Sequence, residues 1–220
     1  MDGGVPFPDP TESRAVRALA RLRNRTAKRE RRAWARGTLD GILSQLRPGD
    51  VALDCGAGIG ETALPIARTG ATLYAFEPDP TAHAALAPKL APFDHAHAVE
   101  AAVSDWTGTT TLPSTDTEAR VLDLTQILRD MIAGRVPRAI PPRPGIRRRP
   151  GRVALLILDI AGEELNLLPA LHESGLLDPV AATLVQTHAR RFPNLKREFT
   201  QMRRDIGGLY SARKVNLDWS

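Results

Sequence analysis

The sequence predicts an α/β fold in which a doubly wound sheet of parallel strands carries helices on both faces. Short apolar runs alternate with segments of helical character over 51–206. The runs show no regular polar–apolar alternation, which is typical of strands that are buried on both faces. A turn with glycines at positions 56, 58 and 60 follows the first run. Ligands of such sheets bind beyond the carboxyl ends of the strands, so we expect a ligand site at that edge.

The expected elements follow one another along the chain. Strands are expected at 51–55, 71–76, 97–103, 154–158 and 182–187. Helices are expected at 61–68, 80–90, 163–172 and 195–206. Two extended pieces at 107–112 and 120–124 and a helix at 124–132 interrupt the alternation between the third and fourth strands. Right-handed connections between the parallel strands then give one wound sheet.

The chain divides into two parts. Residues 1–48 are expected to form a lead-in and a helical extension, and residues 49–220 the α/β domain. Within the extension, 14–36 is rich in arginine and alanine and predicts a basic helix, and apolar residues at helical spacing predict a second helix at 39–46. Several prolines exclude a regular element from 135–152, which also contains many arginines and is interpreted as an exposed loop.

The composition is typical of a globular protein without a membrane-spanning helix. The chain has 220 residues, of which 42% are hydrophobic and 25% charged, as is ordinary for a globular protein. No apolar run approaches the roughly 20 residues of a membrane-spanning helix, the N-terminus shows no signal-peptide pattern, and the single cysteine excludes an internal disulfide. We therefore expect a cytoplasmic protein. The net charge of +5 leaves open a nucleic-acid partner, bound through the basic helix 14–36 and the loop 135–152.

The turn after the first strand indicates the kind of ligand. Its glycines let the backbone pass where a Cβ atom would collide, and Asp54 stands two positions before the first of them. A carboxylate there would repel a diphosphate, but it suits a ligand with a sulfonium and an ammonium group, which is S-adenosylmethionine. Glu77, after the second apolar run, can accept hydrogen bonds from both hydroxyls of a ribose. We therefore predict that Asp54, Gly56, Gly58, Gly60 and Glu77 bind S-adenosylmethionine.

Four blocks of sequence, in order within about residues 50–190, also carry a family resemblance. They are 51–62 (VALDCGAGIGET), 75–80 (AFEPDP), 102–105 (AVSD) with Gly108, and 156–165 (LILDIAGEEL). The blocks resemble the FkbM-type S-adenosylmethionine-dependent methyltransferases. The resemblance implies a Rossmann-like class I methyltransferase fold and an enzyme that methylates a hydroxyl oxygen on a small-molecule acceptor, such as a sugar, a polyketide or a related metabolite.

The resemblance implies roles for five further residues. Relatives contact adenine after the third strand, which assigns Ser104 and Asp105 to the cofactor, although Asp105 could equally be a turn residue. Asp159 resembles an acid at the edge of the active site and is assigned to positioning the acceptor or the cofactor, with helix capping as the alternative. Glu164 matches the family's second acid in that block and either orients the acceptor or is a solvated acid in the first turn of a helix. His188 follows the fifth strand, where a neutral imidazole is a candidate general base near pH 7.

The sequence also departs from the family pattern. Relatives usually have a lysine directly before this aspartate and a glutamate two positions after it, where this chain has Leu158 and Ala161, and Gln186 replaces an acid that is common near the end of the fifth strand. Three alternatives therefore stay open. They are an RNA methyltransferase, a non-catalytic module that binds S-adenosylmethionine or a partner, and an NAD-linked oxidoreductase. The histidines show no spacing typical of a metal site.

Overall fold

The computed structural model describes residues 25–29, 32–112, 115–135, 137–140, 152–217 and 219. The predicted lead-in 1–12, the first part of the basic helix up to residue 24 and most of the 135–152 loop lie outside the described residues. Residues 25–29 and 32–35 are helical, as predicted for that part of the basic segment. Within the described ranges, no helix combines the length and the apolar character needed to cross a membrane.

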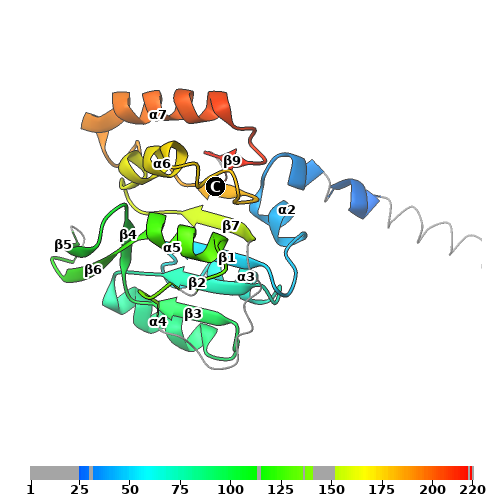
Figure 1. Cartoon of the computed structure of the whole chain (residues 1–220), viewed down its shortest axis with the longest axis horizontal. Helices are drawn as coiled ribbons and strands as arrows, with labels where there is room; N and C mark the ends of the chain where they lie inside the picture. The colour runs from blue at the N-terminus through cyan, green and yellow to red at the C-terminus, as the bar shows by residue number, and fades with distance from the viewer. Residues whose placement is uncertain are drawn as a thin grey trace, which may run out of the picture.

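The chain has the doubly wound α/β fold that the sequence predicts (Figure 1). A sheet of six parallel strands has the order β3-β2-β1-β7-β8-β9. The strands are β1 (Val51–Cys55), β2 (Thr72–Phe76), β3 (Ala96–Val99), β7 (Val153–Leu158), β8 (Thr183–Val185) and β9 (Val215–Asn216). The helices are α2 (Leu39–Leu43), α3 (Ala63–Ala67), α4 (Pro80–Leu90), α5 (Leu124–Ile132), α6 (Glu164–Glu173), the short 3-10 helix η1 (Pro193–Leu195) and α7 (Lys196–Leu209).

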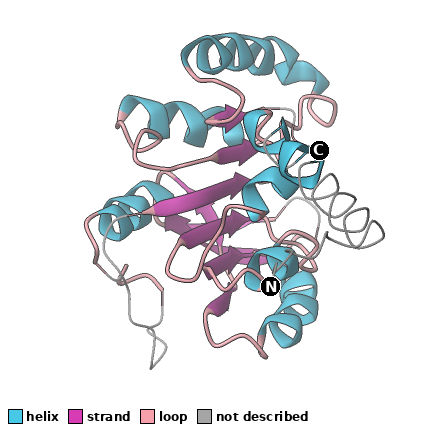
Figure 2. Cartoon of the chain, turned by 90° about the vertical axis from the view of Figure 1, so that its right-hand side faces the viewer, coloured by secondary structure: helices cyan, strands magenta, loops and turns pink. Residues whose placement is uncertain are grey.

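Each face of the sheet packs against its own set of helices (Figure 2). Because side chains alternate along a strand, Leu53 and Cys55 of β1 join an apolar cluster with residues of α5, α6 and α7, whereas Ala52 joins a second cluster with residues of α2, α3 and α4. Both faces are therefore buried, which explains why the strands are apolar throughout.

The prediction of one continuous strand at 97–103 is wrong, because the structure divides this segment into two strands. β3 ends at Val99, and the N–H of Ala101 donates to the carbonyl of Val99 at 3.0 Å, which closes a tight turn around the exposed Glu100. β4 (Ala102–Ser104) then joins β5 (Gly108–Thr111) and β6 (Glu118–Asp123) in a separate sheet of order β4-β6-β5. This small sheet contributes one wall of the site described below.

Candidate functional site

The register of the central strands brings three predicted site residues together. The last residue of β1, Cys55, pairs with the last residue of β2 on one side and with the last residue of β7 on the other, so these strands end level. The residues that follow them directly are Gly56, Glu77 and Asp159. All three line one cavity at the carboxyl edge of the sheet, where ligands of such sheets bind.

Gly56 is required by the way the turn after β1 packs. Its N–H and that of Ala57 donate to the carbonyl of Phe76 at 2.9 and 3.0 Å, which ties the turn to β2. Gly56 has φ +84°, and a Cβ atom there would lie 1.8 Å from the carbonyl oxygen of Asp159. The sequence predicted a close approach to a ligand at this glycine, whereas the close approach that the structure shows is to the backbone after β7.

The other two glycines of the turn have different surroundings. Gly58 has φ +53°, and a Cβ atom there would meet no atom within 4 Å, so this part of the turn borders open space. A Cβ atom at Gly60 would lie 3.0 Å from a methyl carbon of Leu86 in α4, so Gly60 allows the turn to pack on that helix. Of the three predicted glycines, Gly56 is the one that lines the cavity.

Glu77 organises the loops on either side of it. Its Oε2 accepts the N–H of Gly58 at 2.7 Å, and its Oε1 accepts the N–H of Asp79 at 2.9 Å. The N-terminus of α4 is capped by Asp79, whose carboxylate accepts the N–H of Ala82 at 2.8 Å, so Glu77 is not the cap. Each carboxylate oxygen of Glu77 keeps a second lone pair, and these are free to accept hydrogen bonds from a ligand in the cavity.

Asp54 is a fully buried carboxylate that lacks a complete set of partners. Its Oδ2 accepts a hydrogen bond from the hydroxyl of Thr62 at 2.6 Å, while its Oδ1 has no partner within the described part of the chain. Burial raises the pKa of Asp54 to about 7; the bond from Thr62 opposes the rise, and the negative charges of Asp159 and Glu77 add to it. Because β1 lies between β2 and β7, Asp54 lies near both acids of the cavity, but it does not itself line the cavity. Asp159 is paired with His188, whereas Asp54 forms no ion pair within the described part of the chain.

Asp159, which lines the cavity, is joined to His188 and Glu164, which do not line it. The ring of His188 lies between two carboxylates, with Nε2 3.1 Å from Oδ1 of Asp159 and Nδ1 2.5 Å from Oε1 of Glu164. Glu164 is fully buried and also accepts the N–H of Ile160 at 3.3 Å and of Gly162 at 2.7 Å. The alternative of a solvated Glu164 is therefore wrong, and Asp159 contacts His188 rather than capping α6.

The pairing of His188 determines its charge. The hydrogen bonds to Asp159 and then to Glu164 raise the pKa of His188 to about 9, against the opposing effect of burial. A protonated imidazole donates from both nitrogens and has no lone pair left to accept a proton. The prediction of a neutral imidazole base at pH 7 is therefore wrong for this structure, because two carboxylates hold the ring in its charged form.

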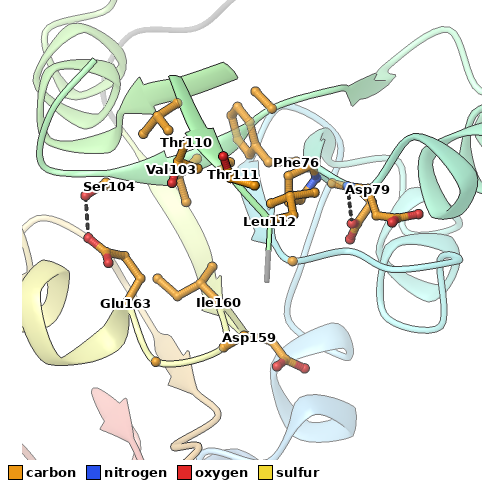
Figure 3. A pocket seen from close by; sticks show the side chains of 18 of the residues that line it. Phe76, Asp79, Val103, Ser104, Thr110, Thr111, Leu112, Asp159, Ile160 and Glu163 are labelled. Atoms are coloured by element: carbon orange, nitrogen blue, oxygen red, sulfur yellow. Dashed lines mark hydrogen bonds between the residues drawn. The ribbon is translucent and has the colours of Figure 1, made fainter. Parts of the chain in front are cut away.

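The cavity has a volume of about 530 Å³ and lies between the carboxyl edge of the central sheet and the sheet formed by β4, β5 and β6 (Figure 3). In its wall, the hydroxyl of Ser104 lies 2.5 Å from Oε1 of Glu163 and 3.2 Å from Oδ1 of Asp105. Ser104 lines the cavity, whereas Asp105 is exposed and does not. Figure 3 shows the carboxylate of Asp159 turned away from the Ser104–Glu163 pair, with Ile160 between them.

Most lining residues were not predicted from the sequence, among them Trp106, Glu163, Arg191 and Phe192. These four come from loops, where no periodic pattern indicates direction. Gly162 offered one usable signal, because a glycine allows another group to approach the backbone closely. In the structure, a Cβ atom at Gly162 would lie 2.8 Å from the ring of Phe192.

Comparisons with family models and with curated proteins find no match for this sequence. Among solved structures, methyltransferase FkbM from Methylobacillus flagellatus KT aligns with 74% of this chain and 39% of its own, at 18% identity and a TM-score of 0.45. A structure from Clostridium thermocellum described as a "putative rRNA-methylase" aligns with 29% of this chain and 38% of its own, at 20% identity and a TM-score of 0.27. The matched part thus spans about two fifths of each of these proteins.

Proposed function

We propose that the protein is an S-adenosylmethionine-dependent methyltransferase that acts on a hydroxyl oxygen of a small molecule. The observation that carries this proposal is Asp54, a buried carboxylate with one unpartnered oxygen, beside the acids Glu77 and Asp159. Such a group favours a ligand that brings positive charge. A sulfonium and an ammonium group meet that demand.

The residues present fit this cofactor. Asp54, with its unpartnered Oδ1, would hold the methionine end of the ligand directly or through a water. Glu77 has lone pairs available for two ribose hydroxyls, and Ser104 lies farther along the same cavity. The same acids argue against NAD, whose diphosphate they would repel.

The cavity also suits a small acceptor. Its volume of about 530 Å³ lies within the roughly 300–1,000 Å³ that is usual for small-molecule sites. Position 161 lacks the acid that the FkbM pattern places there, but Glu163 brings a carboxylate to the same wall. This observation favours an enzyme over a non-catalytic binding module.

When bound, S-adenosylmethionine supplies an electrophilic methyl group on sulfur. The chain's own task is to hold an acceptor hydroxyl in line and to take its proton, and alignment contributes most of the acceleration. Oδ1 of Asp159 is held by His188, and Oδ2 has no partner within the described residues. We assign Oδ2 as the atom that accepts the hydroxyl proton. His188 and Glu164 then act as positioning residues that fix the orientation of Asp159.

A first test removes the proposed ribose contact. We expect Glu77→Ala to weaken S-adenosylmethionine binding by about 1 to 3 kcal/mol, because charged hydrogen bonds are left unmade. Isothermal titration calorimetry measures the change. Glu61→Ala is the matched control, because Glu61 is exposed and does not line the cavity. Equal affinities of the two variants would remove Glu77 from the site, and absence of binding to the unmodified protein would overturn the proposed function.

A further inference from the structure

The charges around the cavity are unevenly distributed along the edge of the sheet. The acids Glu77 and Asp159 follow β2 and β7, whereas Arg191 lies in the segment after β8. Neighbouring strands lie about 4.8 Å apart, so β2 and β8, three positions apart in the sheet, are separated by about 14 Å. The cavity therefore has Glu77, which forms no ion pair among the described residues, at its β2 end and Arg191 in the segment after β8. Asp159, which is paired with His188, follows β7 between them.

Arg191 belongs to a segment that is anchored on both sides. Its backbone N–H donates to the carbonyl of His188 at 2.8 Å, and the ring of His188 is held by two carboxylates. Phe192, the next residue, packs closely on Gly162 and stacks on Phe199 of α7, with ring centroids 6.5 Å apart. The backbone at Arg191 is thus fixed at the cavity, although the side chain is exposed.

The guanidinium of Arg191 is a cation at the cavity wall. Within the part of the chain that the structure describes, its side chain forms neither a hydrogen bond nor an ion pair, and residues 189–197 include no acid. Arg190, Lys196 and Arg197 in the same segment are exposed as well. A guanidinium binds a carboxylate or a phosphate with two parallel hydrogen bonds, so an anion is the natural occupant of this end.

We infer that the methyl acceptor is an anion, a hydroxylated molecule whose carboxylate or phosphate group is bound by Arg191. The inference rests on the proposed function and extends it to the class of substrate. The end of the cavity at Glu77 then takes the cationic cofactor, the end at Arg191 takes the anionic group of the acceptor, and Asp159 lies between them, where the acceptor hydroxyl is deprotonated. Trp106, Phe192 and Leu195 add an apolar surface for the body of the acceptor.

The test uses the protein saturated with S-adenosylhomocysteine, so that the cofactor end is filled. Phenyl phosphate, benzoate and the neutral benzyl alcohol are titrated as probes, together with a fluorescein-labelled RNA of ten nucleotides. We expect at least one anionic probe to bind about 10-fold more tightly than benzyl alcohol, and Arg191→Gln to remove about 10-fold of that affinity. Arg190→Gln is the matched control, since Arg190 is exposed and does not line the cavity.

Each outcome decides the inference. Arg191-dependent binding of the aromatic anions supports it and indicates a small acceptor. Arg191-dependent binding of the RNA alone would overturn it, because the acceptor would then be a nucleic acid and not a small molecule. Equal affinity for anionic and neutral probes, or equal losses in Arg191→Gln and Arg190→Gln, overturns it. S-adenosylmethionine is also titrated into the unmodified protein and into Arg191→Gln. If only the inference about the anion fails, both proteins still bind the cofactor. If the proposed function fails, neither protein binds it.

Discussion

Glu164→Gln should lower the free energy of unfolding at pH 7 by about 3 to 5 kcal/mol, the usual cost of removing one partner of a buried charged pair. The carboxylate is fully buried and accepts from His188 and from the N–H groups of Ile160 and Gly162. A glutamine offers one acceptor oxygen and turns an N–H₂ group toward donors. The imidazolium of His188 would then keep a single carboxylate partner, Asp159. Urea unfolding followed by circular dichroism measures the loss.

The neighbouring residue supplies the control for this prediction. Glu163→Gln also removes a carboxylate from the start of α6, but the side chain of Glu163 is only partly buried, and an amide oxygen can still accept from Ser104. We expect a change below about 1 kcal/mol. Similar losses in both variants would contradict the role given to Glu164.

The contact between His188 and Glu164 also makes the free energy of unfolding depend on pH. The pKa of His188 is raised from 6.5 to about 9, so folding stabilises the protonated ring. The resulting stability is fully present below pH 6.5 and is lost as the pH rises through 9. In Glu164→Gln the pKa should move back toward its usual value, which nuclear magnetic resonance of the ring protons can follow.

Asp54→Asn should raise the stability of the ligand-free protein at pH 8 by about 2 to 4 kcal/mol. The pKa of Asp54 is raised from 3.8 to about 7, so the native state favours the protonated carboxyl. The contribution of Asp54 to the free energy of unfolding is fully present below pH 3.8. It falls as the pH rises from 3.8 to about 7 and stays low above about pH 7. A difference of about three pKa units corresponds to about 4 kcal/mol. The side-chain amide of the variant cannot ionise, so this loss of stability is avoided. Its N–H₂ group stays without a hydrogen-bond partner, which makes the gain in stability smaller than about 4 kcal/mol.

The stability difference between variant and unmodified protein isolates this effect from other titrations. Plotted against pH, the advantage of Asp54→Asn should grow between about pH 4 and 7 and then level off. Asp94→Asn, at an exposed position, should show no such curve. An Asp54→Asn protein that is less stable than the unmodified protein at pH 8 would contradict a buried, uncompensated charge.

Much of the fold could be predicted because local signals agree with the tertiary structure. The strand 51–55 and the helices 80–90 and 124–132 have the bounds that the structure shows. Asp79 and Asp123 cap those two helices, and such caps are visible in the sequence. The division of 97–103 into two strands could not be predicted, because both halves are apolar. The halves differ only in the sheet that each one joins. β9 has two residues, too few for any pattern.

The site could be predicted only as far as strand ends determine it. Glu77 and Asp159 line one cavity because parallel strands end at one edge, and Asp54 belongs to the strand between them. The charge of His188 depends on Glu164, which lies 24 positions earlier, and no sequence pattern reports that contact. Arg191 stands in an irregular loop, so only the anchoring of that loop places it at the cavity.

Titration calorimetry of S-adenosylmethionine at pH 6.5, in two buffers of different ionisation enthalpy, tests the central claim most directly. Asp54 with a pKa of about 7 is mostly protonated at this pH, and a bound cation should ionise it. The unmodified protein should therefore bind the cofactor and release roughly 0.7 proton, whereas Asp54→Asn should release none. Absence of binding heat, or binding with the same proton balance in both proteins, would contradict the account.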